Sequence, residues 1–280
     1  MRKIHTSVII QTIKEMCMEA NITLSNDVKI KIEQARNYEK SEIGKQILEQ
    51  LETNMKIAKE EKIPICQDTG MAIVFLEIGQ DVHIEGINLE DAINEGIRQG
   101  YQEGYLRKSV VSDPILRENT NDNTPGIIHY QIVDGENIKI TVAPKGFGSE
   151  NMSRVYMLKP ADGIDGVINA VIETVSLAGP NACPPMVVGV GIGGSFEKCT
   201  YLAKKALTRD LNEHSNIKYV KELEMKLLKR LNQLGIGPAG LGGTTTVLGV
   251  NIETYPTHIA GLPVAINICC HVNRHTSKVI

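Results

Sequence analysis

The sequence contains no C-x-x-C motif, which excludes a locally encoded zinc knuckle or thioredoxin-type redox pair. A chain of 280 residues can bury a large core without disulfide bonds. We therefore expect free thiols in a reducing compartment, and any metal site must be assembled from distant segments. The six cysteines are Cys17, Cys66, Cys183, Cys199, Cys269 and Cys270.

Long apolar runs and a strong charge excess are also missing. No stretch approaches the roughly 20 apolar residues of a membrane span. The start, Met1–Thr6, leads into a segment with interleaved charges and not into the continuous apolar run of a secretion signal. The net charge of -3 gives no general attraction to nucleic acid or lipid. We expect a cytoplasmic protein with neither nucleic-acid nor membrane partners.

The hydrophobic pattern predicts an α+β protein. Apolar residues recur at spacings of three and four through residues 6–60, with Ser41 as a helix cap, so a helical N-terminal segment is expected. A mixed α/β body follows, in which residues 71–76 form a buried strand and Asn88 caps a helix. Repeats and low-complexity segments are absent, so we expect one domain over residues 1–280, with three cysteine-bearing loops converging on one site.

Two glycine-containing patterns have local interpretations. Ile127–Val133 and Ile138–Val142 flank Asp134-Gly135-Glu136-Asn137, which predicts a β-hairpin. Gly189, Gly191 and Gly194 match G-x-G-x-x-G, a dinucleotide-binding pattern. No repeated strand-helix pattern surrounds it, so close packing of a strand on a helix explains these glycines better.

The cysteines divide into two groups. Cys17 and Cys199 lie on the apolar stripes of predicted helices and are expected in the core. Cys66, Cys183 and one of the pair at 269 and 270 lie in loops rich in glycine, proline and polar residues. Three thiolates from separate loops can hold a 4Fe-4S cluster and leave one iron open as a Lewis acid. A cysteine nucleophile or three buried thiols remain alternatives on spacing alone.

Two further polar stretches could bind an anion. The run from Arg107 to Gly126 is typical of a turn-forming surface, but its arginines could also clamp a carboxylate. The stretch Lys145–Asn151 places glycines next to serine and asparagine, which lets backbone N–H groups approach an anion closely. A plain loop is the alternative there.

Several motifs together resemble one protein family, in order from about residue 5 to the end. They are I-C-Q-D-T-G, L-R-x-S, N-T-x-D-N-T-P, K-G-x-G-S-E-N, G-P-N-A-C-P-P and the terminal C-H-x-x-R-H. The chain is similar to the alpha subunit of the iron-sulfur (class I) fumarate hydratase and L-tartrate dehydratase family. This resemblance implies an oxygen-sensitive 4Fe-4S cluster on Cys66, Cys183 and Cys270, with Cys269 as the competing ligand.

The resemblance also implies an activity and its residues. The family is hydro-lyases, so we expect reversible hydration of fumarate to malate, with L-tartrate dehydration or a non-catalytic iron-sulfur sensor as alternatives. Asp68 and His258 would be catalytic, and Gln67, Arg107 and Gly148 would bind the dicarboxylate. Phe147 stands where the family pattern has a further glycine. A separate beta subunit would complete the site, in an alpha2beta2 assembly.

Overall fold

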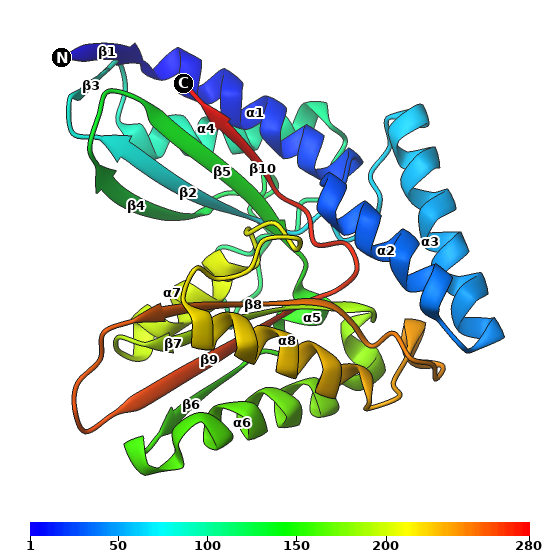
Figure 1. Ribbon diagram of the computed structural model, residues 1–280. Helices are drawn as coiled ribbons and strands as arrows, with labels where there is room; N and C mark the ends of the chain where they lie inside the picture. The colour runs from blue at the N-terminus through cyan, green and yellow to red at the C-terminus, as the bar shows by residue number, and fades with distance from the viewer. The chain divides into compact units, whose positions relative to one another are not determined.

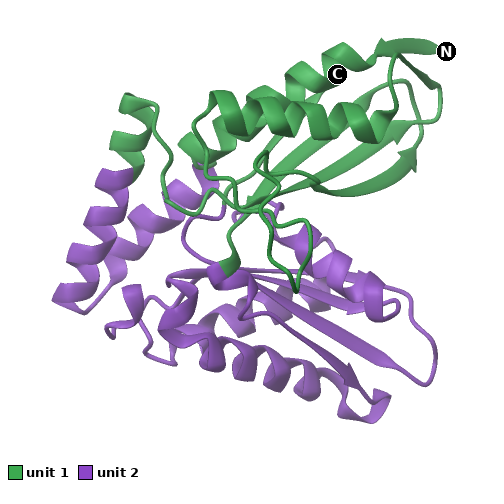
Figure 2. Cartoon of the chain, turned by 180° about the vertical axis from the view of Figure 1, so that it is seen from behind, with its two compact units in different colours: residues 1–25, 55–147, 274–280 green, residues 26–54, 148–273 purple.

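The computed structural model describes residues 1–280 and confirms an α+β protein. Figure 1 shows its elements, and Figure 2 shows the two compact units into which the chain divides. Unit 1 comprises Met1–Ser25, Met55–Phe147 and Arg274–Ile280, and unit 2 comprises Asn26–Asn54 and Gly148–Asn273. Because the units share interleaved segments, the single-domain assignment stays a prediction. None of the helices has both the length and the apolar character needed to cross a lipid bilayer.

Unit 1 contains a four-stranded sheet of order β10-β5-β2-β4 and a parallel pair of β1 with β3. Helices α1 and α4 pack against each other beside the larger sheet (Figure 1). Its strands are β1 (Arg2–His5), β2 (Met71–Gly79), β3 (Val82–Glu85), β4 (Ile127–Val133), β5 (Ile138–Lys145) and β10 (Thr276–Val279). Its helices are α1 (Thr6–Ile22) and α4 (Leu89–Glu103), and α3 (Glu42–Glu61) begins in unit 2 and ends in unit 1.

The predicted hairpin of β4 and β5 is wrong. Strand β2 lies between the two, parallel to β4 and antiparallel to β5. The connection between them crosses the end of β2, where the N–H of Gly79 donates to the Asn137 carbonyl at 2.9 Å. Pairing with the mostly buried strand β2 satisfies more backbone groups and buries more apolar surface than a two-stranded hairpin would.

The helical predictions for this unit are confirmed. Ile9, Ile13 and Cys17 of α1 are completely buried, and burial raises the pKa of the Cys17 thiol to about 12. Asn88 caps α4, because its Oδ1 accepts the N–H of Glu90 at 2.9 Å. Spacing and capping residues therefore located these helices correctly.

Unit 2 contains a four-stranded sheet of order β6-β9-β7-β8, with α7 on one face and α6 and α8 on the other (Figure 1). Its strands are β6 (Arg154–Leu158), β7 (Met186–Gly193), β8 (Val247–Tyr255) and β9 (Leu262–Cys269). Its helices are α2 (Asn26–Tyr38), α5 (Phe147–Glu150, from the end of unit 1), α6 (Gly163–Ala178), α7 (Phe196–Ala206) and α8 (Lys218–Asn232). Short 3-10 turns cover Pro160–Asp162, Gly179–Ala182 and Pro238–Gly240.

Close strand-helix packing explains two of the G-x-G-x-x-G glycines. A Cβ at Gly189 would lie 2.2 Å from the Ala203 carbonyl oxygen, and one at Gly191 would lie 2.0 Å from the Cys199 carbonyl oxygen. Both carbonyls belong to α7, so only glycine lets this helix lie directly on β7. The packing interpretation of these glycines is confirmed.

Glu39 anchors the glycine-rich segment 235–246 of unit 2. Its side chain is 2% exposed and accepts the backbone N–H groups of Thr244 at 2.8 Å and Thr245 at 2.8 Å. It also accepts the N–H of Ser41 at 2.9 Å. Burial opposes its ionisation, but these N–H donors outweigh burial and lower the pKa of Glu39 to about 2. One buried carboxylate therefore fixes a segment that has little regular structure of its own.

Replacing Glu39 by Gln should lower the free energy of unfolding by about 2 kcal/mol, because the amide turns an N–H donor toward backbone donors. The pKa of Glu39 is lower in the folded chain than its ordinary value of 4.5. The carboxylate's contribution is therefore complete above about pH 4.5 and shrinks as the pH falls toward 2. In denaturant unfolding, the difference in free energy of unfolding between wild type and Glu39→Gln should be smaller at about pH 3 than at about pH 6.

A matched control is Glu42→Gln, since Glu42 is an exposed carboxylate whose ion pair with Lys45 lies on the surface. Its removal should change stability by less than about 1 kcal/mol. Equal unfolding curves for Glu39→Gln and wild type at neutral pH would contradict the anchoring role.

Candidate active site

Unit 2 brings two of the predicted cluster ligands together. The backbone N–H of His271 donates to the Cys183 carbonyl at 3.4 Å, and Nδ1 of His271 lies 3.1 Å from the same oxygen. Strands β7 and β9 pair antiparallel with Val187 opposite Cys269, so the Cys183 loop and the residues that follow β9 meet at one end of the sheet. Cys183 and Cys270 are therefore neighbours although they lie 87 positions apart in the sequence.

Exposure separates the six thiols into two groups of three. Cys17, Cys199 and Cys269 are buried, whereas Cys66 and Cys270 are half-buried and Cys183 is exposed. Cys269 ends β9, is 4% exposed, and its Sγ lies 3.9 Å from the Val272 carbonyl. A cluster ligand must present its sulfur outside the packed core, so this division favours Cys270 over Cys269. The predicted burial of Cys17 and Cys199 is confirmed.

The Cys183 loop is held in a strained conformation. Cys183 has a left-handed backbone with φ of 50°, which costs a residue with a Cβ of order 1–3 kcal/mol. The segment 235–246 supports it, since the N–H of Ala239 donates to the Pro184 carbonyl at 2.9 Å. A Cβ at Gly240 would lie 2.4 Å from Cβ of Pro180, so the two loops touch closely. Glu39 thus supports the Cys183 loop through this segment.

The Cys66–Gly70 turn lies in unit 1, with Cys66 half-buried and Gln67 exposed. Both oxygens of Asp68 accept backbone N–H groups, Oδ1 from Gly70 at 3.0 Å and Oδ2 from Phe147 at 2.9 Å. These bonds fix the direction of the carboxylate and leave it further lone pairs for a ligand or a proton.

Arg107 lies next to the same turn. The hydroxyl of Thr69 donates to the Arg107 carbonyl at 3.2 Å, and the side chain of Arg107 is exposed. The buried Tyr101 hydroxyl donates to the carbonyls of Thr69 and Gly70, both at 3.0 Å. Burial raises the pKa of Tyr101, so its hydroxyl keeps its proton and remains a donor. The backbone of Arg107 is thereby tied to the segment that carries Asp68, and its guanidinium is left exposed.

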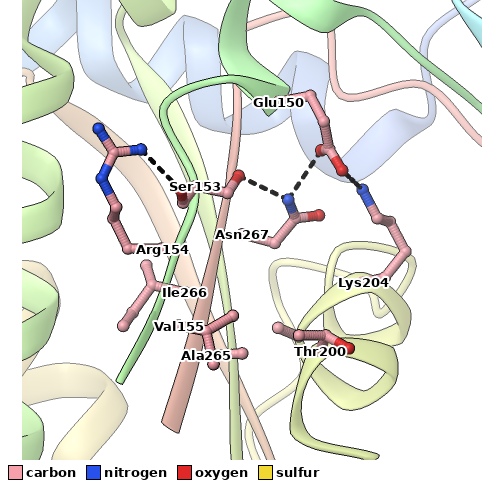
Figure 3. A pocket seen from close by; sticks show the side chains of 10 residues that line it. Glu150, Ser153, Arg154, Val155, Thr200, Lys204, Ala265, Ile266 and Asn267 are labelled. Atoms are coloured by element: carbon pink, nitrogen blue, oxygen red, sulfur yellow. Dashed lines mark hydrogen bonds and ion pairs between the residues drawn. The ribbon is translucent and has the colours of Figure 1, made fainter. Parts of the chain in front are cut away.

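Gly148 directly follows Phe147 and is the first residue of the second segment of unit 2. It is exposed, and a Cβ there would meet no atom within 4 Å, so its backbone is accessible to a ligand. Two residues later, Glu150 lines a pocket of about 170 Å³ (Figure 3). Its carboxylate accepts Nδ2 of Asn267 at 2.8 Å and Nζ of Lys204, and Asn267 also donates to Ser153 at 2.7 Å. This network fastens the segment after Gly148 to β9, three residues before Cys270.

His258 lies at the other end of the unit 2 sheet. It is exposed in the connection between β8 and β9 and lines an apolar pocket of about 540 Å³ with Ile192 and Leu223. Strand β9 begins at Leu262 and ends at Cys269, which separates its ends by roughly 25 Å. The structure therefore does not bring His258 to the thiols of Cys183 and Cys270 within one copy of this unit.

Sequence reasoning missed several supporting residues. Arg274 stands in the C-H-x-x-R-H motif, but the motif gave no sign of its contacts. Lys204 and Asn267 lie in ordinary amphipathic and apolar segments, so only tertiary structure reveals their bond to Glu150. Tyr101 was recognisable only as a member of an apolar helix face. The one signal in the sequence was its hydroxyl, because a polar atom on a buried helix face needs a hydrogen-bond partner.

The fold and these residues define an α+β protein with a pair of accessible thiols at one sheet end and a polar turn that carries a third. Residues 10–279 match the model of the fumarate hydratase (fumerase) family, so the chain belongs to this family. A Methanocaldococcus jannaschii protein provisionally named L(+)-tartrate dehydratase subunit alpha is 45% identical over 276 residues, covering 96% of each chain. The Escherichia coli L(+)-tartrate dehydratase subunit alpha is 33% identical over 261 residues, covering 92% of this chain and 86% of its own.

Serine substitutions test the choice between the adjacent cysteines. Cys270→Ser should remove most of the bound iron and labile sulfide from anaerobically prepared protein, because it deletes an accessible thiolate. Cys269→Ser should leave both contents near wild type and only lower stability by about 1 kcal/mol, since its sulfur is in the core. Cluster loss on Cys269→Ser alone would reverse the ligand assignment.

Proposed function

We propose that this chain is the alpha subunit of a 4Fe-4S-dependent hydro-lyase that interconverts a hydroxy-dicarboxylic acid and its dehydrated form. Fumarate and malate are the first substrate pair. L-tartrate is the second candidate, because the relatives at 45% and 33% identity carry that name. The observation that carries the proposal is the placement of Cys183 beside Cys270 in a chain of the fumarate hydratase family.

The donor set suits an iron-sulfur cluster. Cys66, Cys183 and Cys270 are the three cysteines that are not buried, and all three lie outside the helices and strands. Thiolates are the ligands that such clusters require. When bound, the cluster would supply a Lewis-acidic iron that stabilises the charge on a departing hydroxide. A non-catalytic sensor could use the same ligands but would have no need of the carboxylate-binding residues.

The chain's own residues would bind and orient the substrate. Arg107 would hold one substrate carboxylate through two parallel N–H donors, and the exposed backbone N–H of Gly148 would bind another oxygen. Gln67 would donate from the neighbouring turn. Asp68, held by the N–H groups of Gly70 and Phe147, would transfer a proton to or from the leaving water. Fixed carboxylates keep the breaking bonds aligned.

A separate beta subunit would complete this site, since both relatives are named as alpha subunits. The groups that take the proton from the substrate carbon would come from that subunit. In the alpha2beta2 assembly that we propose, His258 would serve the site of the other alpha copy. Its position at the far end of the sheet from Cys183 and Cys270 supports a role in a neighbouring copy.

The activity test compares both substrates on the same anaerobic preparation. The chain should bind iron and labile sulfide, and with its beta subunit it should hydrate fumarate or dehydrate L-tartrate. Arg107→Lys should raise KM by about 10-fold or more, because lysine cannot form the paired N–H contact. A loaded cluster with no activity on either substrate in the presence of the beta subunit would favour the sensor, and no bound iron would exclude both functions.

A complementation experiment tests the placement of His258. His258→Asn should lower kcat by about 100-fold without iron loss, and Cys183→Ser should abolish activity through loss of the cluster. Each variant alone should have little or no activity, yet mixed assemblies of the two should regain activity, since one site then has both an intact cluster and an intact histidine. Failure of mixed assemblies to gain activity would place His258 outside the partner's site.

A further inference from the structure

The backbone carbonyls of the Cys66–Gly70 turn are bound by donors from distant segments of unit 1. Arg274 donates Nη2 to the Asp68 carbonyl oxygen, and Tyr101 donates to the next two carbonyls. Nδ2 of Asn123 adds a bond to the Gly70 carbonyl at 3.2 Å. A turn held at three successive carbonyls has little freedom to rotate its peptide planes. The orientation of the side chains it carries is set by these donors.

Arg274 differs from the other two donors because it is charged and joins two segments. It is 4% exposed, and its Nε donates to the Pro144 carbonyl at 3.2 Å while Nη2 bonds to Asp68. One planar guanidinium therefore bridges the Cys66–Gly70 turn and the Pro144–Phe147 segment. Its Nη1 is buried and makes no hydrogen bond within the chain. Burying a cation against carbonyls is costly, and neutral donors would suffice if only two hydrogen bonds were needed.

The same segment also meets the carboxylate of Asp68. The N–H of Phe147 donates to Oδ2 at 2.9 Å. A Cβ at Gly146 would lie 3.0 Å from Oδ2 of Asp68 and 3.6 Å from Nη2 of Arg274. The guanidinium and the carboxylate thus lie around this glycine, and any displacement of the Pro144–Phe147 segment moves the donor to Asp68.

We propose that Arg274 is a positioning residue of the active site. Its guanidinium locks the Cys66–Gly70 turn to the Pro144–Phe147 segment and so fixes the direction of the Asp68 carboxylate. Arg274 itself touches no substrate. The inference rests on the proposed function, in which Asp68 transfers a proton and Cys66 is a cluster ligand.

Arg274→Lys tests this role in the holoenzyme with its beta subunit. Lysine keeps the charge but cannot donate in two directions from one plane, so it can bind one carbonyl and not bridge both. We expect kcat to fall by about 10- to 100-fold, since a displacement of about 1 Å at a reacting group has an effect of this size. KM should change less than kcat, by less than about 3-fold, because the exposed guanidinium of Arg107 is not bonded to Arg274. Iron content per chain should stay near wild type.

Two further variants separate positioning from general stability. Gly146→Ala leaves Arg274 in place but inserts a methyl group 3.0 Å from Oδ2 of Asp68, so it should reproduce the fall in kcat even if Arg274→Lys folds poorly. Arg209→Lys is the matched control, since Arg209 bonds Glu253 at 2.8 Å and Glu224 at a site in unit 2. It should lower the melting temperature and leave kcat unchanged.

The outcomes distinguish this inference from the proposed function. Wild-type kcat in both Arg274→Lys and Gly146→Ala would overturn the positioning role, and so would a loss of activity that only parallels a loss of iron. An inactive wild-type holoenzyme with a loaded cluster would instead reject the hydro-lyase function on which the inference depends.

Discussion

The antiparallel pairing of β7 with β9 is the constraint on which the unit 2 site depends. Its register places Val187 opposite Cys269, so the loop before β7 and the segment after β9 emerge at the same sheet end. A slip by one residue would turn the whole apolar set of β9 to the other face. Gly189 and Gly191 preserve the pairing by admitting α7 without displacing the strand. The proximity of Cys183 and Cys270 follows from this register.

Buried charged side chains hold the loops of both units. Glu39 binds the N–H groups of Thr244 and Thr245, and Arg274 binds the carbonyls of Asp68 and Pro144. The half-buried Glu150 ties its own segment to Asn267. Loops that carry reactive groups lack the regular hydrogen bonds of helices and strands, so their backbone groups need other partners. An ionised side chain gives shorter and stronger bonds for this purpose than a neutral one.

In both units, the residues that the family motifs predict to bind substrate are exposed, and the residues that hold their segments are more buried. Gln67, Arg107 and Gly148 are exposed, while Thr69 and Tyr101, which bond to the backbone of the turn region in unit 1, are buried. His258 is exposed at the opposite sheet end beside an apolar pocket. In each unit, the residues predicted to contact substrate are therefore accessible, while the residues that hold their segments in place are less so.

The sequence by itself determined the helices, the buried thiols and the family. Spacing placed Ile9 and Cys17 on one buried helix face, and Asn88 caps the helix that follows it. The motifs around Cys66 and Cys183 are made of neighbouring residues and can be read directly from the sequence. Tertiary structure alone decided the insertion of β2 between β4 and β5, the distance of His258 from the thiols, and the bond from Arg274 to Asp68 across 206 positions. The reason is that periodicity and capping are set by neighbours along the chain, whereas strand order and buried polar contacts depend on which distant segments satisfy one another's backbone groups.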